Sequence, residues 1–259
     1  NYIKNYNFKG YNMRRPTAAG NWKMNGLREN FDDIFLIDAA SKHVNCDVIL
    51  CVPDTLIKEM SERTNNIFTG SQNCHNNKSG AFTGDISAEM IKDAGATHVI
   101  VGHSERRVNY NETNHQIREK SNIALKNKLK AIVCIGETLT ERETGVTLDI
   151  VKRQLVDSLP LEISGKTIIV AYEPVWAIGT GLTPSIEQIK EVHDFIRIEL
   201  ENNFGEKIGQ SINILYGGSM NAKNVDEISA IKNVDGGLVG GASLKADSFI
   251  PIINALSSD

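Results

Sequence analysis

Eight short apolar runs alternate with amphipathic segments along the 259-residue chain. The runs are nearly continuous in hydrophobic character and rich in β-branched residues, a pattern typical of strands that are covered on both faces. Each run predicts a buried strand of a parallel sheet. The predicted strands lie at residues 17–22, 46–52, 66–72, 97–102, 131–136, 167–172, 211–217 and 235–241.

The segments between the runs predict helices. In two of them the apolar residues recur at steps of three and four, which places them on one face of a helix. These residues are Leu148, Val151, Leu155 and Leu159 in the first segment, and Ile189, Val192, Ile196 and Leu200 in the second. The pair Thr183–Pro184 predicts the cap and the first turn of the second helix.

This alternation is compatible with two α/β architectures. One is a doubly wound sheet, and the other is a closed (β/α)8 TIM barrel of about 250 residues. The length and the absence of a linker-like segment favour the barrel, as a single domain over residues 13–259. Residues 1–12, NYIKNYNFKGYN, are polar and lack periodicity, so we expect a poorly ordered extension or a remnant of processing or cloning.

Composition narrows the range of partners. The chain carries 28 Lys and Arg against 32 Asp and Glu, a net charge of −4, and has no extended basic cluster. We therefore expect neither nucleic-acid nor membrane binding, and no apolar run approaches the roughly 20 residues that span a bilayer. The four cysteines form no CxxC pair and predict buried thiols in a reducing compartment, with no metal site.

Polar residues and glycines follow several of the predicted strands. The loops after the strands of a parallel barrel share one face, so these residues are expected to converge there. Taken singly, each has a plainer explanation, such as the start of a helix, a solvated lysine or a tight glycine turn. Their arrival from five separate strands indicates a site, whose candidates are Asn21, Lys23, His103, Glu105, Glu173, Ser219, Gly240 and Gly241.

These residue types favour proton transfer on a small phosphorylated substrate. Backbone N–H groups of glycine turns can approach a phosphate closely because no Cβ intervenes. A carboxylate can take a proton from carbon, while a neutral imidazole and an ammonium polarise the adjacent oxygen. The sequence has no dinucleotide fingerprint or Walker motif, which disfavours hydride and phosphoryl transfer. A Schiff base on Lys23, as in an aldolase, stays open at this point.

Two loops extend this interpretation. Residues 174–181 predict a hydrophobic lid beside Glu173, which would exclude water from a reactive enediolate phosphate. The predicted lid consists of Pro174, Val175, Trp176, Ala177, Ile178, Gly179, Thr180 and Gly181. The second loop, residues 72–85, is long and polar with Ala81–Phe82 in its interior, and it fits either a solvated loop or an interface.

The motifs at these positions resemble the triosephosphate isomerase family. They follow the family's order from about Thr17 to the C-terminus, and they are GNWKMNG (20–26), SGAFTGDIS (79–87), GHSERR (102–107), CIGE (134–137), AYEPVWAIGTG (171–181), YGGS (216–219) and LVGGASLK (238–245). This family is a standard example of a carboxylate base, a neutral histidine electrophile and a closing lid. The resemblance implies reversible conversion of dihydroxyacetone phosphate to D-glyceraldehyde 3-phosphate through an enediolate, without a cofactor.

The resemblance also implies a role for each candidate residue. Glu173 is the expected base, His103 the electrophile and Lys23 the cation that offsets negative charge. Glu105 is expected to support Lys23 from behind. The expected substrate-binding residues are Asn21, Lys23, Gly179, Ser219, Gly240 and Gly241.

A homodimer follows from the same resemblance. In the family the loop that matches residues 72–85 inserts into the partner, and the expected interface residues are Phe82, Thr83, Gly84 and Asp85. The resemblance further implies a place in glycolysis and gluconeogenesis and a cytoplasmic location.

Two alternatives accompany the isomerase interpretation. One is another phosphate-binding barrel enzyme, an aldolase or a sugar-phosphate epimerase, which a trapped Lys23 adduct or a bound divalent metal would favour. The other is a non-catalytic binding protein with the same fold. Such a protein is expected to have lost at least one of Lys23, His103 and Glu173, and the sequence keeps all three.

Overall fold

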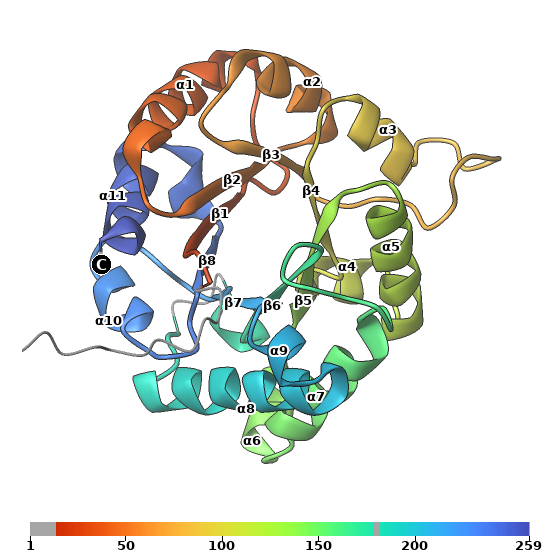
Figure 1. Ribbon diagram of the computed structural model, residues 1–259, viewed down its shortest axis with the longest axis vertical. Helices are drawn as coiled ribbons and strands as arrows, with labels where there is room; N and C mark the ends of the chain where they lie inside the picture. The colour runs from red at the N-terminus through yellow and green to blue at the C-terminus, as the bar shows by residue number, and fades with distance from the viewer. Residues whose placement is uncertain (1–13, 179–181, 259) are drawn as a thin grey trace, which may run out of the picture.

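Eight parallel strands close into a barrel in the computed structural model of the chain, which describes residues 14–178 and 182–258 (Figure 1). The strands pair in sequence order, and the first strand also pairs with the last. They are β1 (Thr17–Asn21), β2 (Asp47–Cys51), β3 (Phe68–Ser71), β4 (His98–Val101), β5 (Lys130–Ile135), β6 (Ile168–Tyr172), β7 (Asn213–Tyr216) and β8 (Gly236–Val239). The predicted (β/α)8 barrel is confirmed, and the doubly wound alternative is wrong because an open sheet leaves its outer strands unpaired.

Helices form a ring around the strands (Figure 1). They are α1 (Phe31–Ala40), α2 (Asp54–Arg63), α3 (Ala88–Asp93), α4 (Ser104–Asn109), α5 (Asn114–Lys126), α6 (Leu139–Glu143), α7 (Thr147–Ser158), α8 (Ile186–Phe204), α9 (Glu206–Gly209), α10 (Val225–Ser229) and α11 (Ala246–Ser257). In the described part of the chain they are accompanied by four 3₁₀ turns, η1 (Arg28–Asn30), η2 (Ser41–His43), η3 (Val175–Ala177) and η4 (Gly241–Leu244). The predicted extension at residues 1–12 lies outside the described residues.

Both faces of the strands are buried, as their continuous apolar character predicts. Inward side chains such as Ile49, Ile100 and Leu215 fill the barrel interior, and outward ones pack against the helices. Each fully buried residue of this size contributes about 1.5–3 kcal/mol relative to an exposed one. This packing makes the barrel a rigid support for the loops at its ends.

One predicted helix start is wrong. Helix α8 begins at Ile186, and its N-cap is Ser185, not Thr183. The Ser185 hydroxyl accepts a hydrogen bond from the N–H of Gln188, whose side chain accepts one from the N–H of Ser185 in return. This exchange satisfies two backbone N–H groups, those of Ser185 and Gln188. Thr183, which is followed by proline, does not provide such an exchange.

The four cysteines are all free and buried, as predicted. Burial raises the pKa of the Cys46 thiol to about 11 and those of Cys51 and Cys74 to about 12, which makes them poor nucleophiles. Within residues 14–178 and 182–258 no cluster of His, Cys, Asp and Glu has the arrangement of a metal site. In the same ranges, no helix has the length and apolar character needed to cross a membrane.

Candidate active site

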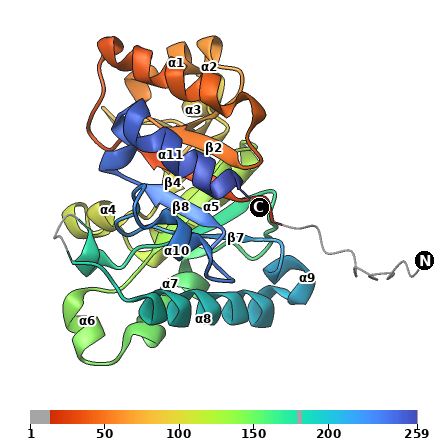
Figure 2. The ribbon, with the colours of Figure 1, turned by 90° about the vertical axis from the view of Figure 1, so that its left-hand side faces the viewer.

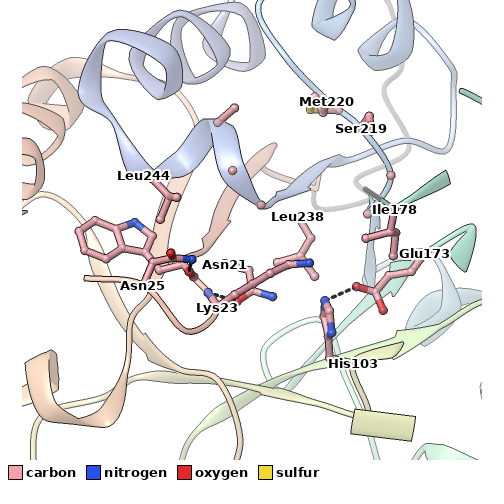
Figure 3. A pocket seen from close by; sticks show the side chains of 16 residues that line it. Asn21, Lys23, Asn25, His103, Glu173, Ile178, Ser219, Met220, Leu238 and Leu244 are labelled. Carbon is pink, nitrogen blue, oxygen red and sulfur yellow. Dashed lines mark hydrogen bonds and ion pairs between the residues drawn. The ribbon is translucent and has the colours of Figure 1, made fainter. Parts of the chain in front are cut away.

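A pocket of about 300 Å³ opens at the carboxyl ends of the strands. In Figure 2, α4 and α6, which follow β4 and β5, lie toward this end of the barrel, and α9, which precedes β7, lies toward the other. The pocket brings together every described residue that the sequence assigns to catalysis or substrate binding (Figure 3). These residues are Asn21, Lys23, His103, Glu173, Ser219, Gly240 and Gly241.

Lys23 is held in an uncommon backbone conformation above the end of β1. Its φ is 53°, in the left-handed region that residues with a side chain seldom adopt. The Asn21 side-chain oxygen accepts the Lys23 N–H at 3.0 Å, which supports this turn. Lys23 Nζ lies 2.6 Å from the Glu105 carboxylate, so Glu105 contacts a residue that lines the pocket. The arrangement points an ammonium at the pocket, and strain of this kind is common at functional sites.

His103 caps the first turn of α4 at the end of β4. Its Nδ1 accepts the N–H of Glu105 at 3.2 Å, and its Nε2 lies 2.9 Å from Oε1 of Glu173 (Figure 3). A ring nitrogen that accepts a hydrogen bond carries no proton, so these partners assign a neutral imidazole with its proton on Nε2. The ring therefore donates into the pocket rather than carrying a full charge.

Glu173 is buried at the end of β6 and keeps its charge through three partners. One carboxylate oxygen faces His103, and the other accepts the backbone N–H of Ser104 at 3.0 Å. Burial raises the pKa of Glu173, but His103, the Ser104 N–H and Lys23 together hold that pKa below its ordinary value of 4.5. Glu173 is thus an ionised carboxylate although only 2% of its surface is exposed.

The pKa of His103 depends on the same pair. Burial lowers it and the Glu173 carboxylate raises it, with an upward result in this arrangement. The Glu105 carboxylate also raises the pKa of His103, and the Lys23 ammonium lowers it, so Glu173 is the largest but not the sole cause of the upward shift.

The opposite wall of the pocket is built from glycine loops after β7 and β8. Among the residues that the structure describes, a Cβ at Gly241 would meet no protein atom within 4 Å, and one at Gly240 only the Lys23 side chain at 3.6 Å. Packing therefore does not require glycine at either position. The free space and the exposed backbone N–H groups fit an anion, which a Cβ would keep at a distance.

Two glycines make room for Glu173: Gly217, which belongs to the glycine turn after the seventh predicted strand, and Gly136, which the sequence did not single out. A Cβ at Gly136 would lie 1.6 Å from the Glu173 carbonyl oxygen, and one at Gly217 would lie 2.8 Å from its Cγ. Real Cβ atoms do not approach other atoms this closely, so Glu173 occupies its position only because both neighbours lack a side chain. Gly217 lies in the YGGS motif and Gly136 in CIGE, which was the only signal for Gly136.

The root of the predicted lid is anchored to a second buried carboxylate. Glu137 Oε1 accepts hydrogen bonds from Trp176 Nε1 at 2.9 Å and from the Tyr172 hydroxyl at 3.1 Å. Ser219 donates to the carbonyl of Ala177 at 3.3 Å, which ties the lid to the β7 loop. Ile178 lines the pocket beside Glu173 (Figure 3), while Gly179, Thr180 and Gly181 lie outside the described residues.

The loop between β3 and α3 projects away from the barrel (Figure 1). Its base closes where His75 pairs with Ser87, and His75 stacks on Phe82 with ring centroids 4.3 Å apart. Phe82, Thr83, Gly84 and Asp85 are all exposed. A second depression, lined by Gly84, Asp85, Lys23 and Glu105, adjoins the catalytic pocket.

Fold and site together define a class of protein. It is a (β/α)8 barrel enzyme that places a carboxylate, a neutral imidazole and an ammonium around a small pocket with a glycine-lined anion wall.

Comparisons with known proteins identify the family. The family model described as triosephosphate isomerase matches residues 16–256. A triosephosphate isomerase of Ruegeria sp. (strain TM1040) is 50% identical over 95% of this chain and 100% of its own length, and one of Rhizobium meliloti is 48% identical over 93% and 96%. The crystal structure of triosephosphate isomerase from Bartonella henselae superposes with a TM-score of 0.88 at 42% identity, covering 94% of this chain and 100% of that one. The chain belongs to the triosephosphate isomerase family.

Proposed function

We propose that the chain interconverts dihydroxyacetone phosphate and D-glyceraldehyde 3-phosphate, with Glu173 as the base. The observation that carries the proposal is the contact between Glu173 and His103 in a pocket that Lys23 and a glycine wall complete. Family membership favours this activity over an aldolase or an epimerase.

The chemistry follows from the geometry in a series of proton transfers. Glu173 takes the proton from C1 of the ketone, and the electron pair moves onto the carbonyl oxygen to give an enediolate. The Nε2–H of His103 and the Lys23 ammonium stabilise the negative oxygens as charge develops. The Nε2–H of His103 then protonates the oxygen on C2, and the imidazole takes the hydroxyl proton from the oxygen on C1 in return. Glu173 delivers its proton to C2, the electron pair on the C1 oxygen forms the aldehyde carbonyl, and both side chains return to their starting protonation states. To reach the substrate, Glu173 would give up both the hydrogen bond from the Ser104 N–H and the contact with His103 Nε2.

The phosphate lies against the opposite wall in this proposal. Gly240, Gly241 and Ser219 line that wall, and their backbone groups would donate to the phosphate oxygens. The lid from Pro174 to Gly181 would close over the intermediate, with Gly179 as a further donor. Exclusion of water protects the enediolate phosphate from loss of its phosphate group.

Replacing Glu173 with aspartate tests the proposed base. The variant Glu173→Asp removes one methylene and withdraws the carboxylate from the reacting carbon, and a displacement of ~1 Å lowers the rate about 10²-fold. A coupled assay on glyceraldehyde 3-phosphate measures kcat and KM, with Glu62→Asp on the exposed face of α2 as the matched control. Wild-type protein without turnover, or a Glu173→Asp variant as active as wild type, would contradict the assignment.

We also propose that the chain acts as a homodimer, in the cytoplasm, as a glycolytic and gluconeogenic enzyme. Exposed apolar side chains on one face support the dimer, since Met24 is 97% exposed, Tyr110 66% and Phe82 41%. Met24 and Tyr110 line the depression beside Lys23 that would receive the partner's projecting loop. Lys23 lines both the catalytic pocket and this depression, and Thr83 of the partner's loop would approach it from there.

A further inference from the structure

A second polar region lies at the amino-terminal end of the barrel, opposite the catalytic pocket. Two cavities of about 470 and 310 Å³ adjoin each other there, and both are lined by Asp47, Lys130 and Lys166. Asp47 and Lys130 are the first residues of β2 and β5, and Lys166 lies just before β6. The proposed function uses none of these residues.

Positive charge exceeds negative charge around these cavities. Lys128, Lys130 and Lys166 line the larger one together with a single carboxylate, Asp47. That carboxylate already pairs with Arg15 at 3.2 Å. Among the described residues, no acceptor lies within ion-pair or hydrogen-bond distance of the three lysine ammonium groups. This local excess of cations stands out in a chain whose net charge is −4.

Lys130 is the central group because it is half-buried and without a partner among the described residues. Burial lowers the pKa of its ammonium, and Asp47 offsets this only in part. His98 beside it adds no charge, since burial and the nearby lysines lower its pKa to about 3. The His98 ring lies against Phe68, with the two ring centroids 5.2 Å apart and the rings tilted, and both residues line the larger cavity. A desolvated cation gains most from an anion that enters the same cavity.

We infer that the amino-terminal end of the barrel binds a small phosphate-bearing anion between Lys130, Lys166 and Lys128. The cavities suit a free phosphate or a small phosphate monoester in size, and lysines bind either through the same charged oxygens. This inference does not rest on the proposed function, because neither of these two cavities shares a lining residue with the catalytic pocket.

Pulse acetylation with acetic anhydride measures how accessible each lysine side chain of the site is. Peptide mass spectrometry gives the acetylation rate of each lysine with inorganic phosphate, with glycerol 3-phosphate, and with chloride at equal ionic strength. We expect phosphate, the monoester or both to slow Lys130 and Lys166 several-fold while the exposed Lys58 on α2 is unaffected. Whether inorganic phosphate or glycerol 3-phosphate protects these lysines shows whether the site takes free phosphate or a phosphate monoester. Lys23 in the same digest reports the catalytic pocket separately.

Two variants complete the test. Lys130→Met keeps the aliphatic stem but removes the charge, so phosphate should no longer protect Lys166, whereas Lys58→Met should leave that protection intact. Both variants should turn over triose phosphate like wild type. Equal protection by chloride, unchanged rates at Lys130 with both phosphates, or full protection of Lys166 in Lys130→Met would each overturn the inference.

Discussion

Single residues at the pocket show two different reasons for glycine. Gly136 is required by packing, because a Cβ there would collide with the backbone of Glu173. A Cβ at Gly241 would meet none of the described residues within 4 Å, so we expect glycine there to serve a ligand. The sequence presents both as members of glycine-containing motifs, and only their surroundings separate the two cases.

Substituting alanine at these glycines separates binding from folding. Gly241→Ala is expected to keep the free energy of unfolding within about 0.5 kcal/mol of wild type but to raise KM, because its Cβ occupies the place of a phosphate oxygen. Gly136→Ala should instead lower the unfolding temperature and kcat, since Glu173 must shift. Thermal unfolding and steady-state kinetics measure both. A Gly241→Ala variant with normal KM would argue against the phosphate site.

At the scale of elements, a buried charge network joins α4, α5 and the loop after β3. Glu112 Oε1 lies 2.6 Å from both Arg106 Nε and Lys120 Nζ, and Lys120 also donates to the Asn73 side chain at 2.8 Å. Burial raises the pKa of Glu112, but Lys120 and Arg106 outweigh it and hold that pKa below 4.5. The network fixes the root of the projecting loop to the barrel.

Neutralising Glu112 should change both stability and its pH dependence. Because the folded pKa lies below the unfolded one, the contribution of Glu112 is fully present above about pH 4.5 and is lost as pH falls through the folded pKa. Glu112→Gln is expected to cost about 3–5 kcal/mol near neutrality, since it leaves Lys120 buried without a countercharge. The loss should shrink toward acid pH.

Denaturant unfolding between pH 3 and 7 measures this effect. Glu62→Gln is the control, because Glu62 forms an exposed pair with Lys58 and such pairs contribute about 0–1 kcal/mol. A constant difference between Glu112→Gln and wild type over the whole pH range would show that the charge of Glu112 does not stabilise the fold.

On the scale of the whole molecule, the two ends of the barrel differ in what they expose. The face around the projecting loop carries Met24, Tyr110 and Phe82 beside the catalytic pocket. Leu161, which is 84% exposed, lies before β6 at the amino-terminal end. A dimer through the first face would complete the edge of the site, while one through the second would not.

Charge substitutions distinguish the two faces. Phe82→Asp should shift the chain from dimer to monomer and lower kcat, because a carboxylate would be buried at the proposed interface. Leu161→Asp should change neither. Light scattering at several protein concentrations gives the mass, and the coupled assay gives the activity. A monomeric wild type, or dissociation by Leu161→Asp alone, would count against the proposed dimer.

The sequence by itself determined the alternating elements, the barrel and the residue types at the strand ends. Hydrophobic periodicity is local, and the carboxyl ends of parallel strands share one face, so Lys23, His103 and Glu173 could be placed together without coordinates. Even so, the predicted start of α8 was wrong, because Ser185, two residues after Thr183, is the residue that caps the helix.

Only the tertiary structure decided how these residues meet. The space that Gly136 and Gly217 leave for Glu173, the hydrogen bond from the Ser104 N–H, and the cation excess around Lys130 all join segments far apart in the chain. Local sequence pattern carries no information on such distances. They are set by the register and closure of the barrel, which fixes each side chain against neighbours from other strands.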